Sequence, residues 1–174
     1  MSSGFTVNAN HFLRNMYSGT DRTLSTSAGR ESASKSKLTF ADSQALKKAI
    51  SELGSFDYSL PESEVNESMK TKFSKDVRAF VDAYNYTLES AKGNDDEEIR
   101  KAGKKMKAFS EKNKDLLNSV GIEVKGSGYL SYDNSRASSL YLHSFGKAFA
   151  SDAEYMQGVS KYASKINNHV DYYA

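Results

Sequence analysis

The stretch "DVRAFVDAYNYTLESAKGNDDEEIRK", Asp76 to Lys101, decides the fold, because it joins two amphipathic helices through a very short turn. Apolar residues recur at steps of three and four from Val65 to Ala91, which predicts a first helix of roughly 30 residues. Gly93 suits the end of that helix, and Asn94 suits the cap of the next one. A connection this short forces the two helices to lie antiparallel and adjacent.

The second helix follows a heptad rhythm. From Ile99 to Val120 its apolar stripe advances by alternating steps of three and four residues, with Asn113 as the one polar member. Asn113 is either a polar residue tolerated at the edge of a bundle or an asparagine that fixes the register of a coiled coil. The inward seam of the two helices is predicted to consist of Phe73, Val77, Phe80, Tyr84, Met106, Phe109 and Leu116.

The rest of the chain completes a mainly α fold. Further helices are predicted at about 42–53 and near the C-terminus. Between them "SVGIEVKGSGYLSYD", Ser119 to Asp133, predicts one small β-hairpin at about 122–132, which must lean on the helices or on another copy of the chain. We therefore expect an antiparallel long-helix hairpin within a helical bundle at 39–174. A serine-rich, flexible or weakly ordered arm is expected at 1–38.

Composition limits the classes of function. Lysine and arginine outnumber acidic residues by 24 to 22, and a net charge of +2 is too small by itself to indicate nucleic acid or an anionic membrane. The absence of cysteine excludes disulfides, thiolate metal sites and cysteine nucleophiles. The chain shows neither a run of about 18 apolar residues, as a membrane helix needs, nor a Sec signal pattern. We expect a protein that is cytoplasmic or is exported without a Sec signal.

Residues that could carry chemistry do not form a recognisable pattern. His11, His143 and His169 are far apart, and none has a second ligand at helical spacing. "NDDEE", Asn94 to Glu98, lacks the spacing of a calcium loop, and acidic residues suit a helix N-terminus in any case. The glycines of "KGSG" lack the rest of a phosphate-binding loop. We therefore expect no enzymatic activity, no metal and no cofactor.

A basic stretch of the second helix supports an alternative function. It consists of Arg100, Lys101, Lys104, Lys105 and Lys107. These side chains would let a small helical nucleic-acid-binding module contact phosphates. The neighbouring acidic residues oppose that interpretation, and a solvated helix face is the usual explanation of such a run.

The order of several short motifs resembles a known family. The first helix contains a valine, then Phe-Val, then Tyr-Asn, as Val77, Phe80, Val81, Tyr84 and Asn85. Downstream come Leu117, Gly121, Ile122, Gly128, Leu130 and Asp133, and then a phenylalanine-containing segment and an amphipathic helix between Ser144 and Tyr173. Over about residues 65–170 the chain is similar to the helical stalk region of the bacterial flagellar filament-capping (hook-associated protein 2) family.

The resemblance implies a bacterial structural or interaction protein, without enzymatic activity, that associates through coiled-coil-type apolar seams. Its partner would be a second copy or a flagellin-like or other helical protein, and it would be exported to the cell surface or flagellum. The side chains expected to contact the partner are Tyr155, Tyr162, Ile166 and Tyr173. The alternative, that these residues only close one monomeric bundle, stays open.

Overall fold

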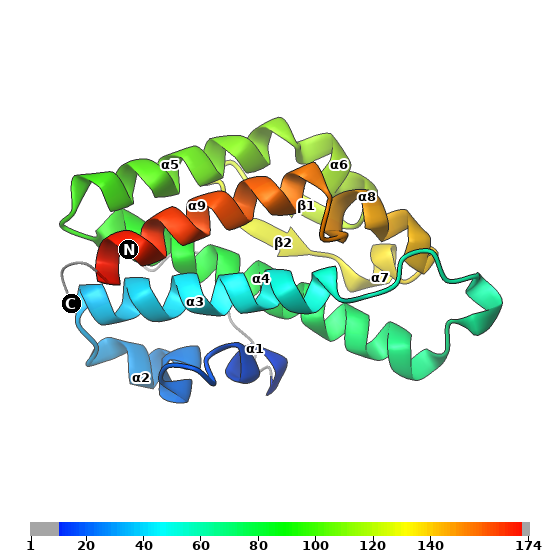
Figure 1. The fold of residues 1–174 in the computed structure, drawn as a ribbon, viewed down its shortest axis with the longest axis horizontal. Coiled ribbons are helices and arrows are strands. Elements are labelled where there is room, and N and C mark those ends of the chain that lie inside the picture. Colours follow the sequence, from blue (N-terminus) through cyan, green and yellow to red (C-terminus); the bar gives the residue numbers. More distant parts are fainter. Residues whose placement is uncertain (1–10, 172–174) are drawn as a thin grey trace.

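Four long helices form an up-and-down bundle in the computed structural model, which describes residues 11–171 (Figure 1). They are α3 (Lys35–Gly54), α4 (Glu67–Gly93), α5 (Glu97–Lys112) and α9 (Glu154–Asp171). α4 and α5 lie side by side and antiparallel, with Ala91 against Gly103 near their turn and Tyr84 against Ser110 farther from it. With one two-stranded hairpin the fold is mainly α, so the predicted fold class is confirmed.

Two helix boundaries differ from the predicted ones. α3 begins at Lys35 rather than at 42, because Ser34 accepts a hydrogen bond from the Lys37 N–H and caps the helix there. The second long helix is interrupted at Asn113, where α5 ends and α6 (Lys114–Ser119) begins. The Asn113 amide donates to the carbonyl of Phe109 at 2.8 Å, so this residue marks a helix junction rather than a position in a continuous coiled coil.

Three buried hydroxyl groups cross the bundle core. Tyr84 of α4 donates to Ser110 of α5 at 2.8 Å, and the Ser110 hydroxyl lies 2.9 Å from that of Tyr155 on α9. Buried polar groups are costly unless they are paired, so this chain of hydroxyls fixes which faces of three helices meet. Of the predicted seam, the buried residues are Phe73, Val77, Phe80, Tyr84 and Met106, while Phe109 and Leu116 are partly buried against them.

The β-hairpin is held by a side chain of α4. β1 (Ile122–Val124) pairs with β2 (Leu130–Tyr132) in antiparallel register. The Asn85 amide donates to the carbonyl of Leu130 at 2.8 Å and accepts from the N–H of Leu130 at 2.8 Å. This buried asparagine therefore occupies the place of a neighbouring strand. A lone hairpin is marginal in water, and here it is stable because the helix supplies its missing edge partner.

Short elements close one end of the bundle. The loop from α3 to α4 contains η2 (Glu62–Glu64), and the segment after the hairpin forms α7 (Asn134–Ala137), η3 (Leu142–Phe145) and α8 (Gly146–Phe149). The ring of Phe145 lies 4.7 Å from that of Phe73, and the ring of Phe149 lies 5.8 Å from that of Phe80. These aromatic contacts seal the core beyond the ends of α3 and α9.

The N-terminal segment is not a loose arm where the structure describes it. Residues 11–34 form α1 (His11–Met16), η1 (Arg22–Ser25) and α2 (Ser27–Glu31), which lie against α3 and α4 (Figure 1). Leu13, Tyr17 and Leu24 are almost completely buried. The expectation of a flexible arm is therefore corrected for residues 11–38, and residues 1–10 lie outside the described part of the chain. Serine-rich composition misled because three apolar side chains suffice to dock short helices.

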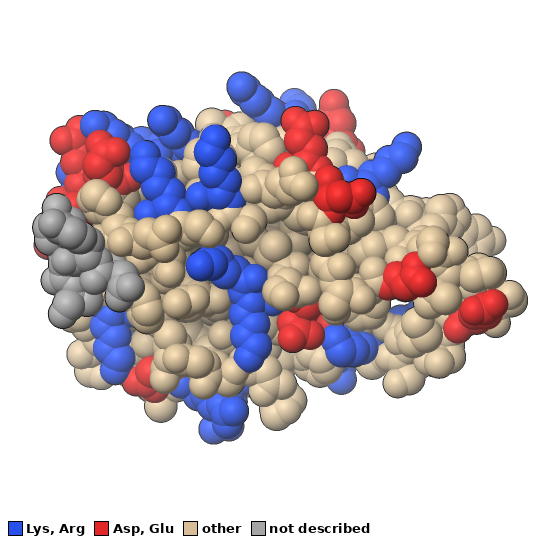
Figure 2. Space-filling view, in the orientation of Figure 1, with Lys and Arg blue, Asp and Glu red and all other residues tan. Residues whose placement is uncertain are grey.

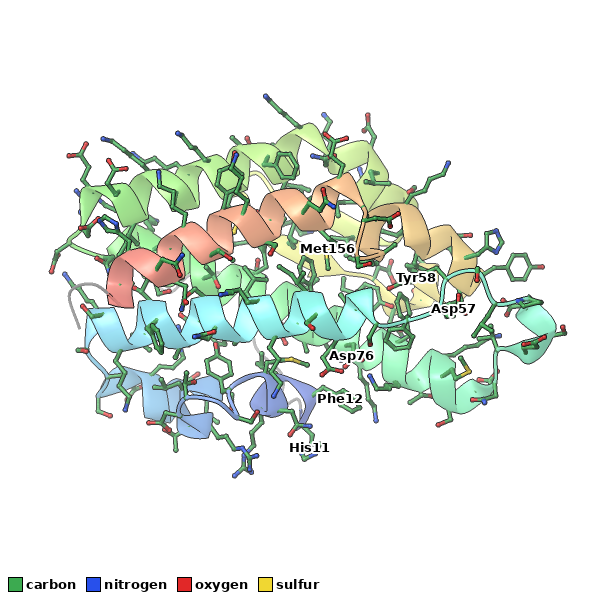
Figure 3. The ribbon with its side chains drawn as sticks, viewed as in Figure 1. His11, Phe12, Asp57, Tyr58, Asp76 and Met156 are labelled. Carbon is green, nitrogen blue, oxygen red and sulfur yellow. The ribbon has the colours of Figure 1, made fainter. Side chains whose placement is uncertain are left out.

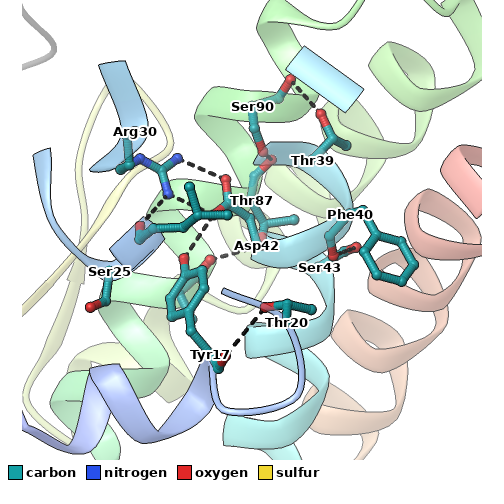
Figure 4. Close-up of polar contacts among 12 residues, drawn as sticks. Tyr17, Thr20, Ser25, Arg30, Thr39, Phe40, Asp42, Ser43, Thr87 and Ser90 are labelled. Carbon is teal, nitrogen blue, oxygen red and sulfur yellow. Dashed lines mark hydrogen bonds and ion pairs between the residues drawn. The ribbon is translucent and has the colours of Figure 1, made fainter. Parts of the chain in front are cut away.

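A buried ion pair fastens this segment (Figure 4). Arg30 contacts both carboxylate oxygens of Asp42 in α3, at 2.7 and 2.8 Å, and Tyr17 donates to the same carboxylate at 2.7 Å. The Arg30 guanidinium also lies 3.6 Å from the centre of the Tyr86 ring on α4. Bidentate geometry and stacking of this kind require arginine rather than lysine. The interaction joins α1 and α2 to two bundle helices at once.

We expect Asp42→Asn to lower the free energy of unfolding by about 3–5 kcal/mol, because Arg30 then loses its carboxylate while it stays largely buried. Urea denaturation followed by circular dichroism measures the change. Lys35→Gln is the control, because it breaks an exposed ion pair with Asp95 and such pairs contribute little. Equal stability of Asp42→Asn and the control would contradict the assigned role.

Asn85→Ala is expected to release the hairpin from α4. The substitution leaves the N–H and the carbonyl of Leu130 without partners, at a cost of about 2 kcal/mol or more. Hydrogen exchange at the Leu130 amide should accelerate far more than exchange in α9. Unchanged protection at Leu130 would show that the hairpin does not depend on Asn85.

Candidate interaction surface

The predicted partner-contact residues are mostly used inside the molecule. The side chains of Tyr155 and Ile166 are 0% exposed, so neither can reach a partner, and that prediction is corrected for both. The Tyr155 ring stacks on that of Phe109 with centroids 6.0 Å apart. The apolar period of α9 faces α3 and α5 of the same chain. A periodicity near 3.5 residues therefore reflected a bundle core and not an outer seam.

The other two predicted contacts have different outcomes. Tyr162 is half-buried, and the edge of its ring meets Phe109 at a centroid distance of 6.1 Å. Phe109 itself lies against Gly158, where any larger residue would collide with its ring. Tyr173 lies outside the described residues.

The basic stretch of α5 is largely paired within the chain. Lys101 forms ion pairs with Glu97 and Glu98, and Arg100 donates to the carbonyls of Asn94 and Asp95. Lys107 lies over Gly128 of the hairpin turn and pairs with Glu111 at 3.8 Å. Lys104 and Lys105 are exposed. Figure 2 shows acidic side chains gathered beside lysines at the end where α5 begins, so this face is mixed in sign.

A groove of about 760 Å³ lies along the N-terminal half of α4, between α1 and the segment that contains α7. We call it the α4 groove. α4 contributes the residues between Glu67 and Arg78 that face it, and Tyr132 of β2 lines the side opposite α1. His11 and Phe12 line it from α1, at the lower edge of the molecule in Figure 3. Its apolar lining includes Leu140, Leu142 and Phe145.

Two exposed cations on α4 line the α4 groove. Arg78 and Lys75 are exposed, lie three residues apart on α4, and form no ion pair with any residue in 11–171. Lys75 lies 5.4 Å from the centre of the Phe12 ring. Lys70 also lines the groove, but Glu62 pairs with it at 2.8 Å. Glu67 is the acidic lining residue.

Polar side chains stand beside these cations. The Ser74 hydroxyl donates to the side-chain oxygen of Asn134 at 2.5 Å, and the Tyr132 hydroxyl lies 3.5 Å from both. The three groups come from α4, α7 and β2. The docked hairpin therefore contributes to one wall of the groove, because Asn85 holds β2 at Leu130, two residues before Tyr132.

An exposed tyrosine adjoins the α4 groove. Tyr141 lies between two lining residues, Leu140 and Leu142, and is 57% exposed. Its ring stacks on that of His143 with centroids 5.9 Å apart. Among the residues that the structure describes it is the large hydrophobic side chain left in solvent. Tyrosine is enriched among the residues that dominate protein interfaces, so Tyr141 is a candidate contact residue.

A buried carboxylate lies one turn beyond Arg78. Asp82 is 9% exposed, and its Oδ2 atom is buried without a hydrogen-bond partner in the described part of the chain. Burial raises the pKa of Asp82 to about 7, and the nearby positive charge of Arg78 opposes that rise. Burial thus favours the protonated form of this carboxyl group.

Two other kinds of site are absent from the part of the chain that the structure describes. Within residues 11–171, no three histidine, cysteine, aspartate or glutamate side chains stand close enough to hold a metal ion. No helix in the same range combines the length and apolarity needed to cross a membrane. No family model, no curated protein and no solved structure matches the chain.

The sequence did carry a weak signal of the groove that our interpretation missed. Thr71, Lys75 and Arg78 recur at steps of four and three on the polar side of α4. That spacing is the same as in any solvated helix face, so only the approach of α1 and α7 distinguishes it. Nothing in the sequence distinguished Tyr141 from the other tyrosines, and single exposed aromatic residues are common on protein surfaces.

Asp82→Asn is expected to stabilise the fold at about pH 8 and to change it little at about pH 4. The carboxyl ionises near 3.8 in the unfolded chain but keeps its proton up to about 7 in the folded one. Between these values unfolding releases a proton, so the wild type loses stability as pH rises, by up to about 4 kcal/mol. Above the pKa of the folded state, the loss in free energy of unfolding no longer changes with pH.

Denaturation at several pH values, with exposed Asp152→Asn as control, checks this expectation. A difference between wild type and Asp82→Asn that is independent of pH would contradict a buried carboxylate with a raised pKa.

Proposed function

We propose that this protein is a non-enzymatic structural or interaction protein that binds a helical partner through Tyr141 and the α4 groove. The observation that carries the proposal is the exposed Tyr141 beside an open, cationic groove. Tyrosine combines a large apolar ring with a polar tip and loses little conformational entropy on binding, which is why it is enriched among the dominant residues of interfaces.

The partner is a second copy of the chain or a flagellin-like helical protein, as the resemblance to flagellar-cap stalks implies. Supporting this, residues of two separate motifs of that resemblance touch one another, since Asn85 of the Tyr-Asn pair holds the backbone of Leu130. The resemblance covers about residues 65–170, which include Tyr141 and the α4 wall of the groove.

Association through this surface needs no opening of the bundle. Tyr155 and Ile166 are buried, so a seam through α9 would require the core to come apart. Binding at Tyr141 instead adds contacts to a surface that already exists. We therefore replace the coiled-coil seam with a preformed surface as the mode of association.

Light scattering over a concentration series, alone and with a bacterial flagellin, tests the proposal. We expect concentration-dependent self-association or a complex, and Tyr141→Ser should weaken either by at least about fivefold, since truncation of a central interface aromatic typically costs more than about 1 kcal/mol. Lys104→Ser changes an exposed residue of α5; it is the control and should behave as the wild type. A monomer at every concentration and no complex with flagellin would contradict the proposal.

A further inference from the structure

We infer that the α4 groove binds an acidic amphipathic helix of the partner; this rests on the proposed function and adds the chemistry of what is bound. The lining combines the cations Arg78 and Lys75 with an apolar region. In that region Phe12 and Leu140 are partly exposed, while Leu142 and Phe145 are almost completely buried beneath them. A segment that fits must present carboxylates to α4 and apolar side chains to the segment around α7.

Charge complementarity selects an acidic partner. Arg78 and Lys75 are exposed and form no ion pair within residues 11–171, so a bound carboxylate displaces none. The carboxylate whose pKa the charge of Arg78 lowers is that of Asp82, which is buried one turn away. Arginine can bind a carboxylate with two parallel hydrogen bonds, which gives such a contact direction as well as attraction. Glu67 stands at the far end of the α4 lining from Arg78, so a bound segment would place its acidic residues toward Arg78.

The dimensions of the groove suit a helix. Its α4 wall runs from Glu67 to Arg78, and at 1.5 Å per residue this is about 16 Å, or three turns of helix. α1 and the α7 segment flank the same exposed face of α4. The groove is thus a position where one more helix would add to the bundle, with its apolar residues repeating every three or four positions.

A bound β-strand fits less well. Strand addition needs a free backbone edge, and the outer edge of β2 at Leu130 is already occupied by the side chain of Asn85. Of the hairpin residues 122–132, Tyr132 is the one that lines the groove. Recognition is therefore by side chains, as in helix-in-groove complexes.

The test uses two fluorescein-labelled peptides of about 18 residues, long enough to form a helix when bound. Both carry leucine at every third or fourth position; one has glutamate and the other lysine at the remaining positions. Fluorescence anisotropy measures their affinities for the full chain at low and high salt. We expect the acidic peptide to bind at least about tenfold more tightly than the basic one, with a preference that weakens in salt.

Charge reversal locates the site. The double variant Lys75→Glu and Arg78→Glu should lose the acidic peptide and gain the basic one. Its matched control, Lys104→Glu with Lys105→Glu, makes the same change of net charge on α5 and should keep the wild-type preference. Circular dichroism checks that both fold. If the reversed variant does not fold, Lys75→Gln with Arg78→Gln takes its place and should lose the preference without reversing it.

The outcomes separate the two proposals. If both double variants lost the acidic peptide equally, attraction would depend on net charge alone, and the inference would be overturned. Peptide binding that neither double variant changes would also overturn it. A wild type that associates through Tyr141 but does not bind the acidic peptide keeps the proposed function and loses only the inference. If the wild type neither associates nor binds the acidic peptide, both the proposed function and the inference are contradicted.

Discussion

The burial of α4 is the constraint on which the rest of the structure depends. Every residue from 79 to 88 of this helix is buried, because α3, α5, the N-terminal helices and the hairpin cover it on all sides. A helix covered in this way must pair each polar side chain it carries. Tyr84 does so through Ser110, and Asn85 does so through the backbone of Leu130. Asp82 is the exception, with one buried oxygen unpaired and a raised pKa.

The same helix also forms the floor of the proposed binding surface. Toward its N-terminus α4 is covered on one side only, and Thr71, Lys75 and Arg78 face solvent between α1 and α7. The hairpin and the N-terminal segment, which look like additions to a helical bundle, are the parts that turn this exposed face into a groove. The contacts of Asn85 and of Arg30 with Asp42 therefore act on the proposed surface indirectly, because they hold its two walls in place.

The apolar periodicity of the sequence predicted the helices well, but it did not predict what each apolar face packs against. The apolar steps of α4 and the short turn at Gly93 to Asp96 were enough to establish the antiparallel pair. The same periodicity in α9 could not distinguish a seam for another molecule from one that closes its own bundle, and Tyr155 and Ile166 proved to be core residues. Local composition concealed the docking of residues 11–38, since the ion pair of Arg30 and Asp42 is visible only in three dimensions. In the sequence the α4 face of the groove looks like any solvated helix face, because the walls that make it a groove come from segments about 60 residues apart.

The central claim is that the covered half of α4 builds the core and its open half binds the partner. Chemical-shift mapping of the isotopically labelled chain during titration with the acidic peptide tests this claim most directly. The account predicts that shifts concentrate at residues 71–78 and 132–142, with little change along α5 and α9. Shifts centred on the lysines of α5, or spread evenly over the surface, would contradict it.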